Sequence, residues 1–215
     1  MIVAHDVEPA PLRLMIYDRT CRGHPLLPGL SHAWGAGGLL YRGMGRIDAC
    51  RGVESWDEAF AWIAEHEPNR PIAEVQYWGH GRWGAPRAGT QVLRQQSLVR
   101  SNPLRTGLDR VARRMLPGEH GLFWFRTCES FGARCGHDFA AAFADAIGCR
   151  AAGHTYIIAL WQSGLHSLLP GDRPRWSADE GLVEGTADDP QRAAWSRARA
   201  PHTISFLHGR IPDGF

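Results

Sequence analysis

The stretch GLFWFRTCESFGAR, residues 121–134, is an apolar run that ends abruptly in a cysteine followed by polar, small and glycine residues. Residues 72–81, IAEVQYWGHG, have the same arrangement, with an apolar run that ends in a histidine between two glycines. Short apolar runs bounded by turn residues are typical of buried strands. The two stretches therefore predict strands that carry a thiol, Cys128, and an imidazole, His80, at their carboxyl ends.

The segments around these two strands alternate between strand and helix patterns. Further strands are expected at 12–18, 37–43, 149–160 and 202–207, and helices at 55–66, 103–115, 136–148 and near 189–199. The first of these helices begins at Ser55, a favourable N-cap, and the helix 136–148 ends at a glycine. Strands that alternate with helices predict an α/β fold, with a mainly parallel sheet sandwiched by helices.

Composition excludes several classes of function. The 215-residue chain has a formal net charge of +2, so neither a nucleic-acid nor a membrane partner is expected. All 24 basic residues are arginine, which excludes a lysine Schiff base and a lysine-bearing phosphate loop. The first residues, MIVAHDVEPAPLRLMIYD, contain acids and prolines where a signal peptide would be basic and then apolar. With five cysteines, an odd count, we expect reduced thiols and a cytoplasmic location.

The thiol and the imidazole suggest nucleophilic chemistry. In an open parallel sheet, functional groups collect at the carboxyl ends of the strands. A nucleophilic thiol needs a base within hydrogen-bond reach, and His80 on a neighbouring strand end supplies one. The glycines beside His80 allow the backbone to approach a reacting centre, where an N–H stabilises an oxyanion.

The order of these elements resembles the caspase-like cysteine peptidases. An apolar strand with His-Gly is followed by an apolar strand with Cys, then by a glycine-led helix and another strand. TCESFG is similar to the Ala-Cys-x-x-Gly nucleophile turn, with one extra residue before the glycine and Thr127 in place of a small residue. GHDFAAAFADAIGCRAAGHT is similar to the segment that follows the nucleophile in bacterial members, which include CHAT domains and toxin-processing domains.

The resemblance covers about residues 10–160, and it implies a function and a set of roles. His80 would be the base or acid, Cys128 the nucleophile, and the backbone amides of Gly81 and Cys128 the oxyanion donors. The implied activity is a cysteine endopeptidase that works through a thioester, without metal or other cofactor, on a protein or peptide substrate. An activating protein partner is left open. We expect one domain over 1–215, in which the loop-rich part, 161–215, completes the sheet and the substrate groove.

Four residues are candidates for substrate binding. Alternate residues of a strand share a face, so Arg126 is expected to point the same way as Cys128 and to bind an Asp or Glu before the scissile bond. The alternative is that an acid such as Asp18 or Glu74 holds Arg126. If basic substrates are preferred, Asp18 or Glu129 becomes the better candidate. Trp161, in the loop region after the last core strand, is a candidate for the wall of the groove.

Three other interpretations remain open at this point. Cys128 to Arg134 spells Cys-x5-Arg, the phosphate-binding signature of tyrosine phosphatases and arsenate reductases. A catalytically inactive binding or scaffold domain would also agree with the nine tryptophans. Cys128, Cys135 and His137 have a weak resemblance to part of a zinc site, but the compact paired spacing of such sites is missing.

Overall fold

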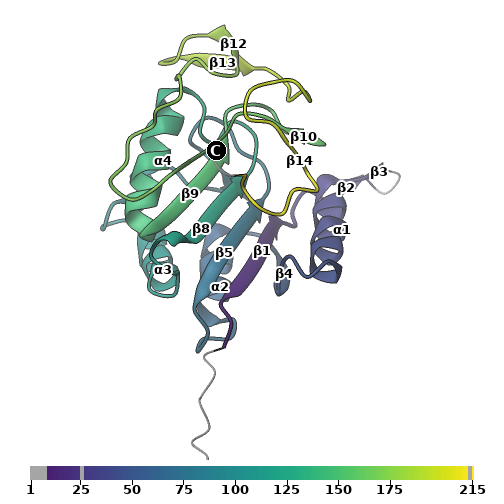
Figure 1. Ribbon diagram of the computed structural model, residues 1–215, viewed down its shortest axis with the longest axis vertical. Coiled ribbons are helices and arrows are strands. Elements are labelled where there is room, and N and C mark those ends of the chain that lie inside the picture. The colour runs from purple at the N-terminus through teal and green to yellow at the C-terminus, as the bar shows by residue number, and fades with distance from the viewer. Residues whose placement is uncertain (1–8, 25–26, 213–214) are drawn as a thin grey trace, which may run out of the picture.

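The computed structural model describes residues 9–24, 27–212 and 215, and its centre is a six-stranded sheet in the order β11-β9-β8-β5-β1-β4 (Figure 1). Its strands are β1 (Leu12–Asp18), β4 (Ala49–Val53), β5 (Ile72–Trp78), β8 (Gly118–Arg126), β9 (Cys149–His154) and β11 (Leu165–Leu168). All neighbours are parallel except β11, which is antiparallel to β9. The predicted α/β class with a mainly parallel sheet is confirmed.

The remaining elements are helices and short ladders. The helices are α1 (Leu30–Gly43), α2 (Trp56–Glu65), α3 (Pro103–Ala112), α4 (Ala133–Ile147) and the 3-10 helix η1 (Gln95–Leu98). The two-stranded pairs are β2 (Gly23–His24) with β3 (Leu27–Pro28), β6 (Arg87–Ala88) with β7 (Gln91–Val92), β10 (Trp161–Gln162) with β14 (Ile204–Ser205), and β12 (Leu182–Gly185) with β13 (Pro190–Ala193). No described helix is both long and apolar enough to cross a membrane.

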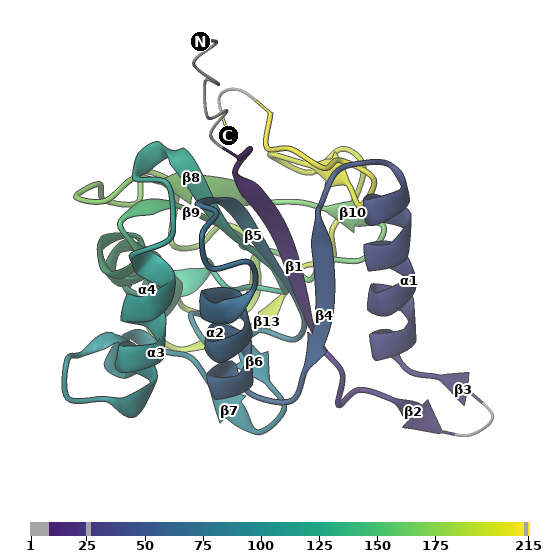
Figure 2. The same cartoon turned by 90° about the horizontal axis from the view of Figure 1, so that it is seen from below.

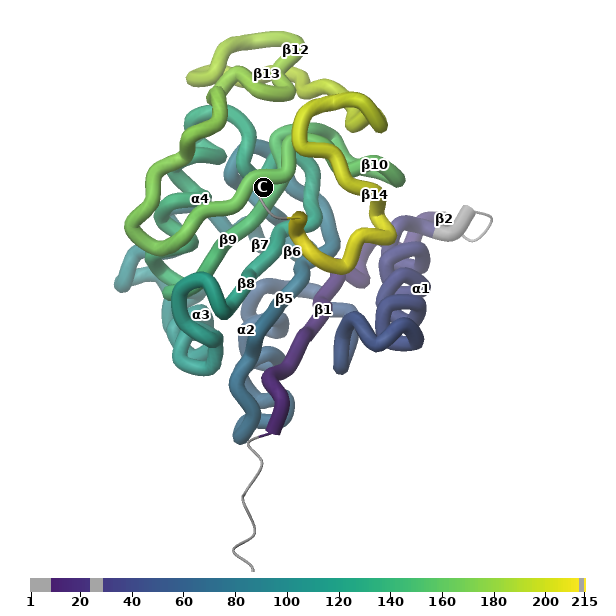
Figure 3. The backbone as a smooth tube through the Cα atoms, in the orientation of Figure 1, coloured from purple at the N-terminus to yellow at the C-terminus, as the bar shows by residue number. Residues whose placement is uncertain are grey.

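Helices cover both faces of the sheet (Figure 2). On one face α2, α3 and α4 build the larger core, in which Phe123 and Phe125 of β8 pack against Phe143 of α4 at centroid distances of 4.9 and 4.7 Å. The alternate residues of β8 point the other way, and Trp124 packs there against Ile204 of the C-terminal segment. This segment crosses the sheet opposite α2–α4, beside α1 (Figure 3). The alternation along β8 therefore decides which side chains face α4 and which face the C-terminal segment.

The strand predicted at 37–43 is wrong, because these residues belong to α1. The glycines of this segment belong to a helix face that packs closely on the sheet. A Cβ on Gly38 would collide with Cys50 Sγ, and one on Gly37 would lie 3.0 Å from the ring of Trp78. Tyr41, on the same helix, is fully buried. The glycines thus let α1 approach β1 and β4 more closely than larger residues would.

Three other element predictions need correction. No helix forms near 189–199: β13 pairs with β12, and the amides of Ala194 and Ser196 donate to Gly181 and Ile157. A short helix without an apolar stripe is marginal, so pairing prevails there. The strand expected over 149–160 ends at His154, and the one over 202–207 is reduced to Ile204–Ser205. The strands at 12–18 and 72–78 and the helix after Ser55, whose hydroxyl accepts from the Glu58 amide, are confirmed.

Candidate active site

The register of the sheet brings the two predicted strand ends together. Trp78 of β5 pairs with Arg126 of β8 in a parallel ladder. His80 and Cys128 each lie two residues beyond this pair, so they follow the carboxyl ends of β5 and β8 at matching positions. After β1 the chain forms β4 on one side of β1 and then β5 on the other side. Where the strand order changes direction in this way, a crevice opens at the carboxyl ends of the strands.

His80 is partly buried beside this crevice. Its ring lies edge-on to Trp34, with 5.5 Å between centroids, and its carbonyl accepts from the Arg87 amide at 2.9 Å. Burial and the nearby Arg87 cation lower the pKa of His80, while the Asp18 carboxylate acts in the opposite direction. The imidazole is therefore neutral at neutral pH, which is the form that accepts a proton.

Cys128 is also partly buried, and its Sγ lies 3.9 Å from the carbonyl oxygen of Ile158. Burial raises the pKa of the Cys128 thiol above its ordinary value, and the Glu129 carboxylate adds to this. Among the described residues, no hydrogen bond joins the His80 ring to Cys128 Sγ. The thiol and the imidazole at these two strand ends are thus both neutral, and they do not form a preformed ion pair.

The backbone of Gly81 packs closely against Thr127 and Cys128. A Cβ on Gly81 would lie 2.7 Å from Thr127 Oγ1 and 2.8 Å from the carbonyl oxygen of Cys128, so only glycine fits there. Within the described part of the chain, neither amide donates to a backbone carbonyl or to a side-chain oxygen. Free amides on converging loops are the donors that an oxyanion needs.

The turn after β8 contains buried polar groups without partners. Within the described residues these include Thr127 Oγ1, Glu129 Oε2 and Ser130 Oγ. Glu129 has a φ of +55°, in the left-handed region, and burial raises its pKa to about 7. Unpaired buried groups and strained backbone are unfavourable for stability, and they concentrate at functional sites. The turn that carries Cys128 has both features.

Arg126 is only 2% exposed, and its guanidinium is engaged inside the protein. It donates to Gln162 Oε1 at 2.6 Å, to the Tyr41 hydroxyl at 2.6 Å and to the carbonyl oxygens of Phe206 and His208 at 3.0 and 3.1 Å. Its carbon also lies 4.4 Å from the Trp124 ring centroid. Neutral groups, and not Asp18 or Glu74, accept these bonds. The guanidinium presents no free N–H to a substrate carboxylate.

The other predicted substrate-binding residues have different environments. Asp18 is buried, and its carboxylate accepts from the Thr20 amide at 2.8 Å and from the Gly89 amide at 3.1 Å, which fixes the β6–β7 hairpin to β1. Trp161 is 45% exposed on β10. Asp18 is therefore a positioning residue for the loops around His80, whereas Trp161 is accessible.

A cavity of about 800 Å³ opens beside His80 and Gly81. The lining includes Arg82, Arg87 and Arg94, together with Cys135 and Asp138 from the first turns of α4. None of these five residues was predicted from the sequence to belong to the site. The available signal is the concentration of arginines among the Gly, Trp and Pro residues of 81–94.

The geometry speaks against the Cys-x5-Arg interpretation. The amides of Glu129, Phe131 and Arg134 donate to the carbonyl oxygens of Tyr156, His154 and Ala187, so they form no anion cradle. Arg134 itself pairs with Asp188 at 2.7 Å on the surface. A phosphate loop needs these groups free.

The cysteines near α4 do not form a metal site either. Among the described residues, the cluster with metal-like spacing consists of His166, Glu180 and His202, and it includes none of Cys128, Cys135 and His137.

Comparisons of this chain with family models, with curated proteins and with solved structures find no match.

Proposed function

We propose that this protein is a caspase-like cysteine endopeptidase with His80 and Cys128 as its catalytic pair. The observation that carries the proposal is the register of β5 and β8, which aligns the two residues at one edge of the sheet with Gly81 against the carbonyl of Cys128. The order strand–His–Gly, strand–Cys, helix and strand, on which the resemblance to this family rests, agrees with the positions of β5, β8, α4 and β9.

The protonation states support a general-base mechanism. The neutral His80 imidazole accepts the proton of the Cys128 thiol as Sγ attacks the substrate carbonyl carbon. The oxyanion that forms accepts hydrogen bonds from the Gly81 and Cys128 amides. His80 returns the proton to the leaving amine as the C–N bond breaks, which leaves a thioester. Water, deprotonated by His80, then hydrolyses the thioester and restores the thiol.

The cavity beside His80 suggests an acidic peptide as the substrate. Arg82, Arg87 and Arg94 line it, and Asp138 is the single acid among its lining residues. Arginine pairs with carboxylates in a bidentate manner. We therefore assign recognition of Asp or Glu to these arginines and not to Arg126. The exposed Trp161 remains a candidate for the wall of the groove.

A fluorogenic peptide library, varied at the residue before the cut, tests the proposal. We expect the wild-type chain to cleave after Asp or Glu, and Cys128→Ala and His80→Ala to lose all cleavage. Cys135→Ala is the matched control, because this exposed thiol lines the cavity beside His80. Cleavage that survives in Cys128→Ala, or that is lost only in Cys135→Ala, would refute the dyad.

An inactive scaffold domain is the second candidate. The raised pKa of the Cys128 thiol favours it, as does the absence of a His80–Cys128 hydrogen bond among the residues that the structure describes. A peptide-like alkylating electrophile distinguishes the two. Selective labelling of Cys128 that depends on His80 supports an enzyme. Equal labelling of Cys128 and Cys135 supports the scaffold.

A further inference from the structure

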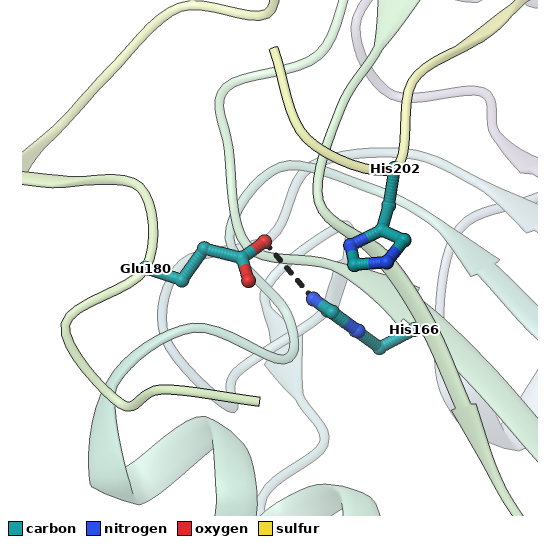
Figure 4. Close-up of side chains that lie close together, drawn as sticks. All are labelled: His166, Glu180 and His202. Carbon is teal, nitrogen blue, oxygen red and sulfur yellow. Dashed lines mark hydrogen bonds and ion pairs between the residues drawn. The ribbon is translucent and has the colours of Figure 1, made fainter. Parts of the chain in front are cut away.

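Three segments of the chain bring the side chains of His166, Glu180 and His202 close together (Figure 4). They come from β11, from the loop before β12 and from the loop before β14. Their ligand atoms all lie within 4.8 Å of one another, and His166 Nε2 is 2.9 Å from Glu180 Oε1. We propose that these three residues bind a Zn²⁺ ion, at a site separate from Cys128.

Contacts hold the side chains of His166 and Glu180 and the backbone of His202. The His166 ring lies flat on Trp176, with 4.5 Å between centroids and 8° between planes. Thr155 Oγ1 donates to Glu180 Oε1 at 3.0 Å, which is the outer-shell contact that orients ligating carboxylates. The carbonyl of His202 accepts from the Leu165 amide at 3.1 Å and ties the loop to the start of β11.

The backbone conformation of His202 also indicates that the surroundings constrain this residue. Its φ of +44° lies in the left-handed region, which non-glycine residues seldom adopt. Such a conformation persists only where the surroundings enforce it, and it concentrates at ligand-binding positions. The His202 ring lies 4.8 Å, centroid to centroid, from that of His166.

Two imidazoles and a carboxylate are a donor set that Zn²⁺ favours, with bonds of about 2.0–2.2 Å. Neighbouring donors around a tetrahedral ion are then roughly 3.3 Å apart, close to the 2.9 Å between His166 and Glu180. The exposed His202 ring needs only a side-chain rotation to complete the set. For His166 to bind through Nε2, its ring proton moves to Nδ1 and the Nε2 lone pair faces the ion.

The cluster opens into a cavity of about 400 Å³, which leaves room for a fourth ligand. Three protein ligands with one open position are typical of zinc sites that hold water or an anion. Arg173 and Arg175 line the same cavity and favour an anion in that position. Both arginines are exposed, so water and salt screen their repulsion of the ion.

The test is a Zn²⁺ titration of the full chain after chelator treatment, with calorimetry in competition with a chelator and metal counting by mass spectrometry. We expect one Zn²⁺ per chain, bound more tightly than about 1 μM. His202→Ala and Glu180→Gln should weaken binding at least about 100-fold, and Thr155→Val about 10- to 100-fold. His120→Ala is the control, because His120 is exposed and lies outside the cluster.

Two further measurements identify the ligands and exclude misfolding. Zn²⁺ should raise the melting temperature of the wild type but not of His202→Ala, whose circular dichroism should match the wild type because the ring is exposed. Co²⁺ in place of Zn²⁺ should give a spectrum of nitrogen and oxygen ligands. No Zn²⁺ binding by the wild type, unchanged affinity in both ligand variants, or a thiolate-to-Co²⁺ charge-transfer band would overturn the proposal.

Discussion

Trp78 of β5 and Arg126 of β8 are register partners, and the guanidinium carbon of Arg126 lies 4.6 Å from the centroid of the Trp78 ring. The contact lies at the edge of the sheet from which His80 and Cys128 follow. Because Arg126 also binds the C-terminal segment through Phe206 and His208, it links this segment to the sheet below the candidate site. Arg126 therefore supports the site from inside the fold.

Arg126→Met should lower the free energy of unfolding by about 3–5 kcal/mol, because several buried acceptors lose their donor, at roughly 1–3 kcal/mol each. Arg126→Lys should also be destabilised, since one ammonium group does not span acceptors on Tyr41, Gln162 and the C-terminal segment. Urea unfolding followed by tryptophan fluorescence measures both. The exposed Arg82→Gln should stay within about 0.5 kcal/mol of the wild type. A fully stable Arg126→Met would show that the network contributes little.

The pKa of His80 should lie below the ordinary value of about 6.5 and should rise in Arg87→Gln. The sign follows from the charge: the Arg87 cation disfavours the imidazolium, so its removal favours protonation. An NMR titration of the imidazole resonances measures the change. Arg110→Gln is a suitable control, because Arg110 lies on α3 and pairs with Glu65. A pKa that falls in Arg87→Gln would contradict the assignment.

Alkylation of Cys128 by iodoacetamide should accelerate with rising pH and continue to do so above the usual thiol pKa of about 8.5. Burial and the Glu129 carboxylate raise the thiol pKa, so the thiolate forms only at higher pH. Glu129→Gln removes the negative charge and should shift the profile to lower pH. Mass spectrometry of the Cys128 peptide gives the rate. A plateau well below the ordinary thiol pKa would mean that an ion pair with His80 exists already.

Gly38→Ala should destabilise the protein by about 1–3 kcal/mol through overpacking, because its Cβ would collide with Cys50 Sγ. Gly43→Ala, at the end of the same helix, has no atom within 4 Å of the new Cβ. Alanine favours the helix there, so this control should be neutral or stabilising by about 0.5–1 kcal/mol. Thermal unfolding of the two variants provides the comparison. Equal stability would argue against close packing of α1 on β4.

Elements that carry their own signal were predictable from the sequence. The strands at 12–18 and 72–78 are mainly apolar stretches, and the helix after Ser55 has an N-cap and a regular apolar spacing. The helix that ends at Gly148, which has a φ of +76°, is of the same kind. The placement of His80 and Cys128 on neighbouring parallel strands followed from the alternation of strands and helices.

Long-range contacts decided the rest. α1 forms because Gly35, Gly37 and Gly38 fit against side chains of β1, β4 and β5, and this fit has no signature within the segment itself. The position of Arg126 depends on carbonyl groups some 80 residues away in the chain. The cluster of His166, Glu180 and His202 likewise exists only where β11 and two loops converge. Local pattern thus determined β1, β5, β8 and the start of β9, most helices and the edge that carries the thiol and the imidazole, whereas β4 and β11 had no recognised signal. Tertiary packing alone decided which polar groups are buried, paired or free, because burial and hydrogen bonding depend on neighbours that are distant in sequence.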